Sequence, residues 1–430
     1  MVFKKRRSKE EIAKYQRLVE QTVYKKGSKY YDEMDQLCFL SKNLYNTTLY
    51  HRRQSFFSDE GLVSFNVLRQ KFVDEDQVDY RALPAKVSNQ IQMLVDQNFS
   101  AFFALLKKKK SGDYDKKIQL PKYLKKDSGR QIVIYPKDAL SFIKSGFIKL
   151  SKTNILIPTN QNKESILQVR LVPKNGYVVA EVVYEVLKEK PLEKNKRYAS
   201  IDIGMNNLMA ISSNVFDPVI INGKPIKSIN EFYNKKIAEA KSQAMMLEGL
   251  YTTNRIKNLY RRRSSKLKDY MHKATAELVN LLVSNNIDTV IIGENKGWKQ
   301  DINIGRKNNR EFVSIPFYIM KGMVKYKCEM RGIEVIFSEE SYTSKASFID
   351  NDKIPTYNKN KKKEPSFSGT RTKRGLYKST NGILINADIN GASNIMKKAL
   401  LKQGLWSDVL FFELVQRIKK NPIKKNIKIN

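Results

Sequence analysis

The sequence is poor in the residues that many catalytic and structural sites require. Its 430 residues include only two cysteines, Cys38 and Cys328, and only two histidines, His51 and His272. Two separated cysteines cannot form a disulfide framework, which fits a reducing cytoplasm. Catalysis by a Cys/His or Ser/His pair has almost no residues to use. Carboxylates therefore remain as the chemical centre.

Long hydrophobic runs and a secretion signal are also missing. Although 41% of the residues are hydrophobic, no apolar run approaches the ~20 residues of a membrane-spanning helix. The basic N-terminal stretch, MVFKKRRSKEEIAKYQ, has no apolar segment after its charges, so it is not a secretory signal. We expect a cytoplasmic protein without a membrane partner.

Acidic residues are outnumbered almost two to one. The 80 lysines and arginines against 43 aspartates and glutamates give a formal net charge of +37. Such an excess indicates a polyanionic partner, with nucleic acid as the first candidate and an anionic membrane as the alternative. A basic helix expected around residues 255–268 would follow a phosphate backbone. In the alternative interpretation, part of this helix is simply solvated.

Three apolar elements each carry one carboxylate. Asp202 lies within the expected strand 198–203, Glu294 follows the expected strand 288–293, and Asp388 begins an amphipathic helix. An aspartate in a buried strand is destabilising unless a cation or a basic neighbour compensates its charge. A carboxylate cluster suits magnesium, which prefers hard oxygen ligands. The alternative for Asp202 is an edge strand with its carboxylate facing solvent.

The segments around these acids carry a family resemblance. SIDIGMNNL, IIGENKGWKQ and NADINGASNI resemble the three RuvC motifs of the transposon-encoded TnpB proteins, RNA-guided DNA nucleases related to compact type V CRISPR effectors. Flanking stretches extend the resemblance over most of the chain: LCFLSKNLYN, DYRALPAKVSNQ, EESYTSKASFID and RTKRGLYKSTNG. Each motif alone is weak, but three in this order with these flanks are specific.

The resemblance implies a multidomain fold that is α/β and β-rich. An RNase H-like (RuvC) nuclease domain would follow an N-terminal wedge β-barrel, which is interrupted by a helical recognition domain. The expected ranges are 1–30 and 118–190 for the wedge, 31–117 for the recognition domain, 191–340 and 384–405 for the nuclease, 341–383 for a basic insert that binds target nucleic acid, and 406–430 for a basic C-terminal tail with a disordered end.

The implied function is RNA-guided DNA cleavage beside a short flanking motif, by Mg²⁺-dependent phosphodiester hydrolysis, for a transposable element. Asp202, Glu294 and Asp388 would hold two Mg²⁺ ions about 4 Å apart. Arg374 is the candidate phosphate contact in the active site, or a backbone contact elsewhere. The implied partners are a guide RNA, double-stranded target DNA and the RNA–DNA heteroduplex, with one monomer on one guide RNA at the prokaryotic nucleoid.

Three other functions stay open: a compact CRISPR-type effector, a cleavage-deficient RNA-guided DNA-binding repressor, and a DNA-strand transferase. The presence of all three acids argues against the repressor. Many relatives carry a four-cysteine zinc ribbon in the insert, whereas residues 341–383 hold no cysteine or histidine. We expect no zinc, magnesium as the only metal, and an apolar cluster including Phe348 and Tyr377 to hold the insert.

Overall fold

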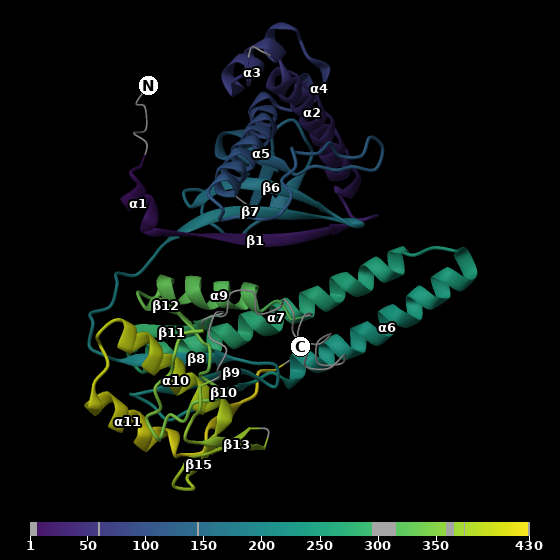
Figure 1. The fold of residues 1–430 in the computed structure, drawn as a ribbon. Coiled ribbons are helices and arrows are strands. Elements are labelled where there is room, and N and C mark those ends of the chain that lie inside the picture. The colour runs from purple at the N-terminus through teal and green to yellow at the C-terminus, as the bar shows by residue number, and fades with distance from the viewer. Residues whose placement is uncertain are drawn as a thin grey trace. The chain divides into compact units, whose positions relative to one another are not determined.

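The computed structural model describes residues 7–58, 61–143, 146–294, 315–357, 365–373 and 375–428. The chain forms two compact units, Met1–Leu187 and Lys188–Asn430, whose elements are labelled in Figure 1. Within the described ranges, no helix combines the length and apolarity needed to cross a membrane.

The first unit combines a helical segment with two antiparallel sheets. The sheets have the strand orders β1-β7-β6-β2 and β3-β4-β5. The strands are β1 (Tyr15–Lys25), β2 (Val133–Pro136), β3 (Leu140–Ile143), β4 (Phe147–Leu150), β5 (Leu156–Pro158), β6 (Ile166–Lys174) and β7 (Tyr177–Leu187). The helices are α1 (Lys9–Ala13), α2 (Tyr31–Phe57), α3 (Phe65–Asp74), α4 (Val78–Arg81) and α5 (Ala85–Lys110).

Strand pairing brings the two ends of this unit together. β1 pairs with β7 along its whole length, from Tyr15 opposite Leu187 to Lys25 opposite Tyr177. The helices α2–α5 are therefore an insertion between paired strands, and their apolar faces share one core with the sheets. Asn175 and Gly176 form the turn between β6 and β7, with Gly176 at φ +85°. The described strands divide between two sheets, so the closed wedge barrel remains a prediction.

The second unit is built on a six-stranded sheet with the order β12-β11-β8-β9-β10-β16. β8, β9 and β10 form an antiparallel meander, while β11 pairs parallel with β8 and β12 parallel with β11. The strands are β8 (Tyr198–Ile203), β9 (Asn207–Ser213), β10 (Val219–Asn222), β11 (Thr289–Glu294), β12 (Glu334–Glu339) and β16 (Ile423–Lys425). The helices are α6 (Lys224–Glu248), α7 (Asn254–Ser284), α9 (Phe317–Met330), α10 (Ala387–Lys402) and α11 (Asp408–Ile418).

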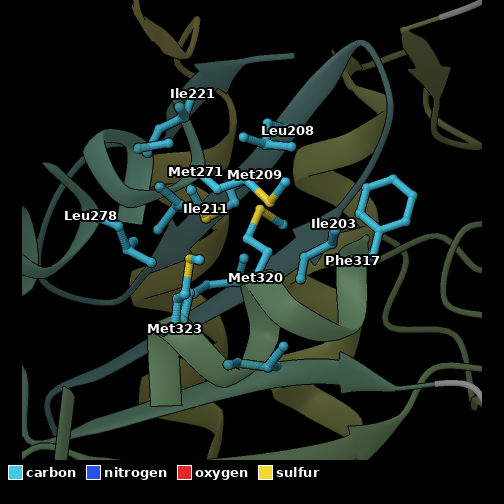
Figure 2. Close-up of a cluster of buried hydrophobic side chains, with 14 of the residues drawn as sticks. Ile203, Leu208, Met209, Ile211, Ile221, Met271, Leu278, Phe317, Met320 and Met323 are labelled. Atoms are coloured by element: carbon cyan, nitrogen blue, oxygen red, sulfur yellow. The ribbon is translucent and has the colours of Figure 1, made fainter. Parts of the chain in front are cut away.

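Helices cover both faces of this sheet. On β11, Val290 and Ile292 join the core that contains α7 and α9, whereas Ile291 joins the core that contains α10 and α11. This alternation follows from the two-residue period of a strand. Figure 2 shows the first core, where Met271 of α7 and Met320 of α9 lie against residues of β8 and β9.

The basic helix expected around residues 255–268 lies within α7, and α6 precedes it as a separate helix. α6 ends at Gly249, which has φ +61° and donates its backbone N–H to the carbonyl of Met245. A glycine adopts this left-handed conformation without the strain that a Cβ would cause. The chain then reverses, and α7 packs back against α6 as a long hairpin (Figure 1).

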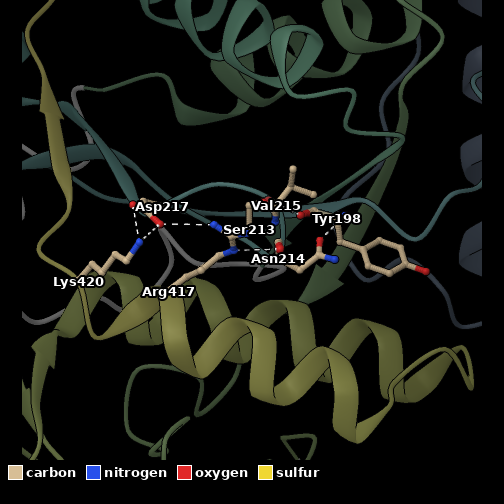
Figure 3. Close-up of polar contacts among 7 residues, drawn as sticks. All are labelled: Tyr198, Ser213, Asn214, Val215, Asp217, Arg417 and Lys420. Atoms are coloured by element: carbon tan, nitrogen blue, oxygen red, sulfur yellow. Dashed lines mark hydrogen bonds and ion pairs between the residues drawn. The ribbon is translucent and has the colours of Figure 1, made fainter.

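The C-terminal segment is attached to the sheet, which corrects the expectation of a disordered end as far as residue 428. In Figure 3 the guanidinium of Arg417 on α11 donates to the carbonyl of Asn214 at 3.0 Å and pairs with Asp217 at 3.4 Å. Lys420 pairs with the same aspartate at 3.0 Å. β16 then pairs parallel with β10 at the sheet edge. Composition alone suggested a tail because its lysines gave no apolar periodicity.

Candidate carboxylate site

Asp202 is a carboxylate inside the sheet rather than at its edge. Its neighbours Ile201 and Ile203 face the core with α7 and α9, so alternation directs Asp202 toward α10. There Gly391 makes room, because a Cβ on it would lie 2.8 Å from Oδ2 of Asp202. Two residues earlier, the Ser200 hydroxyl donates to the carbonyl of Ala392 at 2.7 Å, which fixes α10 against β8. The solvent-facing edge-strand alternative is therefore wrong.

Asp388 lies in the first turn of α10. The Asn386 side chain caps this helix by accepting from the backbone N–H of Asp388 at 3.0 Å. The Asp388 carboxylate accepts from Asn207 Nδ2 at 2.6 Å and from Arg371 Nη2 at 3.4 Å. Gly391 follows Asp388 by three residues and shares its helix face. The two aspartates therefore meet between β8 and α10.

Glu294 is the last residue of β11. Alternation from Val290 and Ile292 assigns it to the sheet face covered by α9. From that helix comes Lys321, whose side chain is buried at 8% exposure. Its ammonium donates to the carbonyl of Gly293 at 2.5 Å. A buried cation thus lies directly beside the strand end that carries Glu294.

Glu340 is a further carboxylate that the sequence reasoning missed. It follows β12, whose register pairs Glu339 with Glu294. A Cβ on Gly293 would lie 2.1 Å from Oε2 of Glu340, so this carboxylate rests directly on the glycine backbone. The sequence could have indicated Glu340 by its place directly after β12, because parallel neighbouring strands end at the same sheet edge.

The electrostatics link these groups. Burial raises the pKa of Asp202 to about 8, with the carboxylates of Glu340 and Asp388 acting in the same direction and Arg371 and Lys321 opposing them. Burial also raises the pKa of Glu340, and the Lys321 ammonium counteracts it. In turn, burial lowers the pKa of Lys321 while Glu340, Glu294 and Asp202 raise it. The Lys321 ammonium is therefore electrostatically coupled to three carboxylates.

The structure brings Asp202, Asp388 and Glu340 together and leaves Glu294 on the neighbouring strand end beside Lys321. In the present rotamers, no three acidic, histidine or cysteine side chains of the described ranges are arranged to hold one metal ion. The donor chemistry nevertheless fits Mg²⁺, since all are hard oxygen ligands. The Gly391 and Gly293 positions also leave space for the carboxylates that a Cβ would fill.

The predicted arginine, Arg374, lies outside the described residues. Arg371, three residues earlier on β13 (Thr370–Lys373), is the arginine that reaches Asp388. Its side chain is 45% exposed, so it borders the site from the solvent side. Sequence position could not choose between the two arginines, because the direction of each depends on the pairing of this short strand.

The insert is held by carboxylate oxygens that accept hydrogen bonds from its backbone N–H groups. β13, β14 (Leu376–Lys378) and β15 (Leu384–Asn386) form a small antiparallel sheet. Asp352 accepts from the backbone N–H groups of Ser347 at 2.7 Å and Ser368 at 3.1 Å. Asp350 accepts from the N–H of Thr380 at 3.0 Å. The expected apolar cluster is confirmed at two members, since Phe348 and Tyr377 are buried in the core with α10.

Two family models match the chain, and both matches lie mostly in the second unit. Residues 181–299 match OrfB_IS605, described as "Probable transposase". Residues 317–395 match the "Cas12f1-like, TNB domain" model, which includes the insert. A curated relative, the TnpB-like protein ORF457 of Acidianus two-tailed virus, is 23% identical over 414 residues, covering 86% of this chain and 83% of the relative. The chain is therefore similar to TnpB-like proteins over most of its length.

The fold is similar to that of a solved protein. It matches the protein in a Cas12f1–sgRNA–target DNA complex with a TM-score of 0.50 and 15% identity, covering 85% of this chain and 82% of that one. At this identity the likeness shows the fold alone. The chain is therefore a mixed α/β multidomain protein with a Cas12f-like arrangement of elements.

Proposed function

We propose that this protein is a compact RNA-guided DNA endonuclease with an RNase H-like (RuvC) catalytic domain in residues 188–428. The observation that carries the proposal is the meeting of Asp202 and Asp388 between β8 and α10, with Glu294 at the end of the adjacent strand. The antiparallel meander continued by the parallel strands β11 and β12 supports the RNase H-like assignment.

The three predicted acids would form the metal site. Asp202, Glu294 and Asp388 would hold Mg²⁺, which when bound supplies Lewis-acid stabilisation of the phosphate and a more acidic water. Asn207 orients the Asp388 carboxylate through its 2.6 Å hydrogen bond. Arg371, half-exposed beside that carboxylate, would contact the phosphate of the strand to be cut, with Arg374 as the neighbouring candidate.

Nucleic-acid binding would come from distributed positive charge. The α6–α7 hairpin segment 241–268 carries eight basic residues against one acidic residue. Backbone contacts of this kind give affinity without sequence information, which guide pairing would then supply. The proposed partners are a guide RNA, target double-stranded DNA and their heteroduplex, bound by one monomer at the nucleoid.

The deciding experiment is purification of the full-length chain from cells that express it with its native flanking sequence. RNA that copurifies is sequenced, and DNA matching its variable end is offered to the complex with Mg²⁺. We expect cleavage that requires both the RNA and a matching target beside a short flanking motif. Binding without cleavage would instead indicate a repressor, and RNA-independent strand joining would indicate a transferase.

A further inference from the structure

The turn between α6 and α7 carries large apolar side chains that are exposed. Between Ala244 and Ile256, none of the described side chains is buried. Three of them are large and almost fully exposed, with Met246 at 82%, Leu247 at 83% and Tyr251 at 80%. Figure 1 shows this turn at the end of the α6–α7 hairpin that lies away from the sheet. A single exposed apolar residue is ordinary, whereas several gathered at one turn indicate an interaction surface.

The backbone of this hairpin turn is held by its own hydrogen bonds. The N–H of Leu250 donates to the carbonyl of Ala244 at 3.2 Å, directly after Gly249 ends α6. On the other side, the Thr253 hydroxyl accepts from the N–H of Ile256 at 3.3 Å and caps α7. The exposed side chains therefore project from an ordered support, so binding a partner loses less conformational entropy.

Positive charge continues from the hairpin turn along α7. Arg255, Arg262 and Lys266 are exposed, and their spacings of seven and four residues place them on one face of the helix. At 1.5 Å per residue this basic stripe is about 17 Å long, which is enough for several phosphates of one strand. An apolar end and a basic stripe thus belong to the same hairpin.

The basic stripe discriminates between the partners that an apolar turn could bind. A second copy of the chain would bring two hairpins of like charge together, which is unfavourable. An anionic membrane would reach only one end of the stripe, because the headgroup layer is only about 5–8 Å deep on each side. An RNA offers both chemistries at once. Its phosphates suit the stripe, and its loops present unpaired bases for stacking, whereas duplex DNA keeps its bases stacked inside.

Resting on the proposed function, we propose that the hairpin turn is a stacking site for the unpaired bases of an RNA loop. Tyr251 supplies an aromatic face for a base, and Leu247 and Met246 shield the stacked base from water. The basic stripe on α7 follows the phosphates of the same loop. The turn therefore distinguishes looped from fully paired RNA, which phosphate contacts alone do not do.

The test measures binding of the full-length protein, freed of nucleic acid, to two forms of one RNA. The first form has an unpaired loop that contains 2-aminopurine, and the second is annealed to its full complement. We expect the double variant Leu247→Ser/Tyr251→Ser to bind the looped form about tenfold more weakly and the duplex like wild type. Wild type should also change the 2-aminopurine fluorescence of the loop by stacking, and the double variant should not.

The salt dependence separates stacking from charge. The double variant should keep the wild-type slope of log affinity against log salt, because it loses no phosphate contact. Arg262→Gln should instead lower that slope by about one for both RNA forms. Tyr251→Phe keeps the ring and should bind like wild type. Val409→Ser/Phe412→Ser is the matched control, because these apolar side chains of α11 are also exposed, at 70% and 63%.

The possible failures are distinguishable. If wild type and Leu247→Ser/Tyr251→Ser bind the looped RNA equally, the stacking site is wrong and the proposed function stands. If wild type binds neither RNA form, the proposed function is wrong as well. A larger effect of the double variant on a DNA hairpin of the same sequence, on anionic vesicles or on self-association in sedimentation would refute RNA as the partner of the turn.

Discussion

The carboxylates of the insert and the buried carboxylate of Asp202 differ in how their charge is compensated. Asp350 and Asp352 in the insert accept hydrogen bonds from backbone N–H groups and serine hydroxyls. Asp202 accepts none from the described residues, and it packs against a glycine with the carboxylates of Glu340 and Asp388 nearby. Asp350 and Asp352 are compensated by hydrogen-bond donors of the insert, whereas Asp202 has no such donor among the described residues.

This difference separates structural from functional acids. A carboxylate with several N–H donors is stable as an anion and ties segments of chain together. A carboxylate that is buried among other carboxylates is held in an unfavourable state, which the surrounding fold must maintain. The insert aspartates therefore hold segments of the insert together, whereas under the proposed function a cation would compensate the carboxylates near α10.

The largest expected effect comes from neutralising the predicted metal ligands one at a time. Asp202→Ala, Glu294→Ala and Asp388→Ala should each reduce cleavage by about a thousandfold or more, since ligands act on the chemical step. Binding of guide and target should persist, because distributed phosphate contacts provide it. Cleavage rates and gel-shift affinities measured on the same preparations check this. Near wild-type cleavage in one variant would remove that residue from the site.

The next effect concerns the buried lysine of the carboxylate site. Lys321→Met leaves three carboxylates without their internal cation, so we expect the metal-free protein to lose about 3 kcal/mol of unfolding free energy. Added Mn²⁺ should restore more stability to this variant than to wild type. Lys325→Met, an exposed position on the same helix, is the control. Equal metal-induced shifts in melting temperature would contradict the role of Lys321.

Neutralising an aspartate of the insert should lower stability and leave metal affinity unchanged. Asp352→Asn removes a charged acceptor from the N–H groups of Ser347 and Ser368, which we expect to destabilise residues 343–380 by about 2 kcal/mol. Amide hydrogen exchange should accelerate there, while Mn²⁺ affinity stays at the wild-type value. Elemental analysis of the same protein should find no stoichiometric zinc. Zinc that is lost with activity on chelation, and restores activity when added back, would overturn this account.

The smallest effect is a difference in pH dependence. Lys397 is buried and donates to the carbonyl of Asp352, and its burial lowers the pKa of the ammonium from 10.5 to about 8. Between these values the unfolded chain binds more protons than the folded one, so this group makes stability rise with pH. The gain should not exceed about 1.4 kcal/mol per pH unit. Urea unfolding of wild type and Lys397→Met between pH 7.5 and 10 should therefore diverge; parallel curves would refute it.

Much of the second unit was predictable from residue periodicity. The strands expected at 198–203 and 288–293 correspond to β8 and β11, and the amphipathic helix expected from Asp388 corresponds to α10. These elements have strong alternation or helical spacing of apolar residues, and packing had only to confirm the local preference. The sequence did not reveal where α6 ends and α7 begins, because Gly249 is a single glycine between two segments that both have helical spacing of apolar residues.

By itself, the sequence determined the resemblance to TnpB proteins, the elements that carry Asp202, Glu294 and Asp388, and the absence of cysteine and histidine from the insert. Each of these depends on residue type and local spacing. The tertiary structure alone decided that Glu340 approaches Asp202, that Lys321 points into the acidic cluster, and that Arg371 reaches Asp388. The reason is that parallel pairing of β11 with β12 and the packing of α9 and α10 join residues far apart in the chain. The spacing of apolar residues within one segment does not reveal contacts between segments that are far apart in the chain.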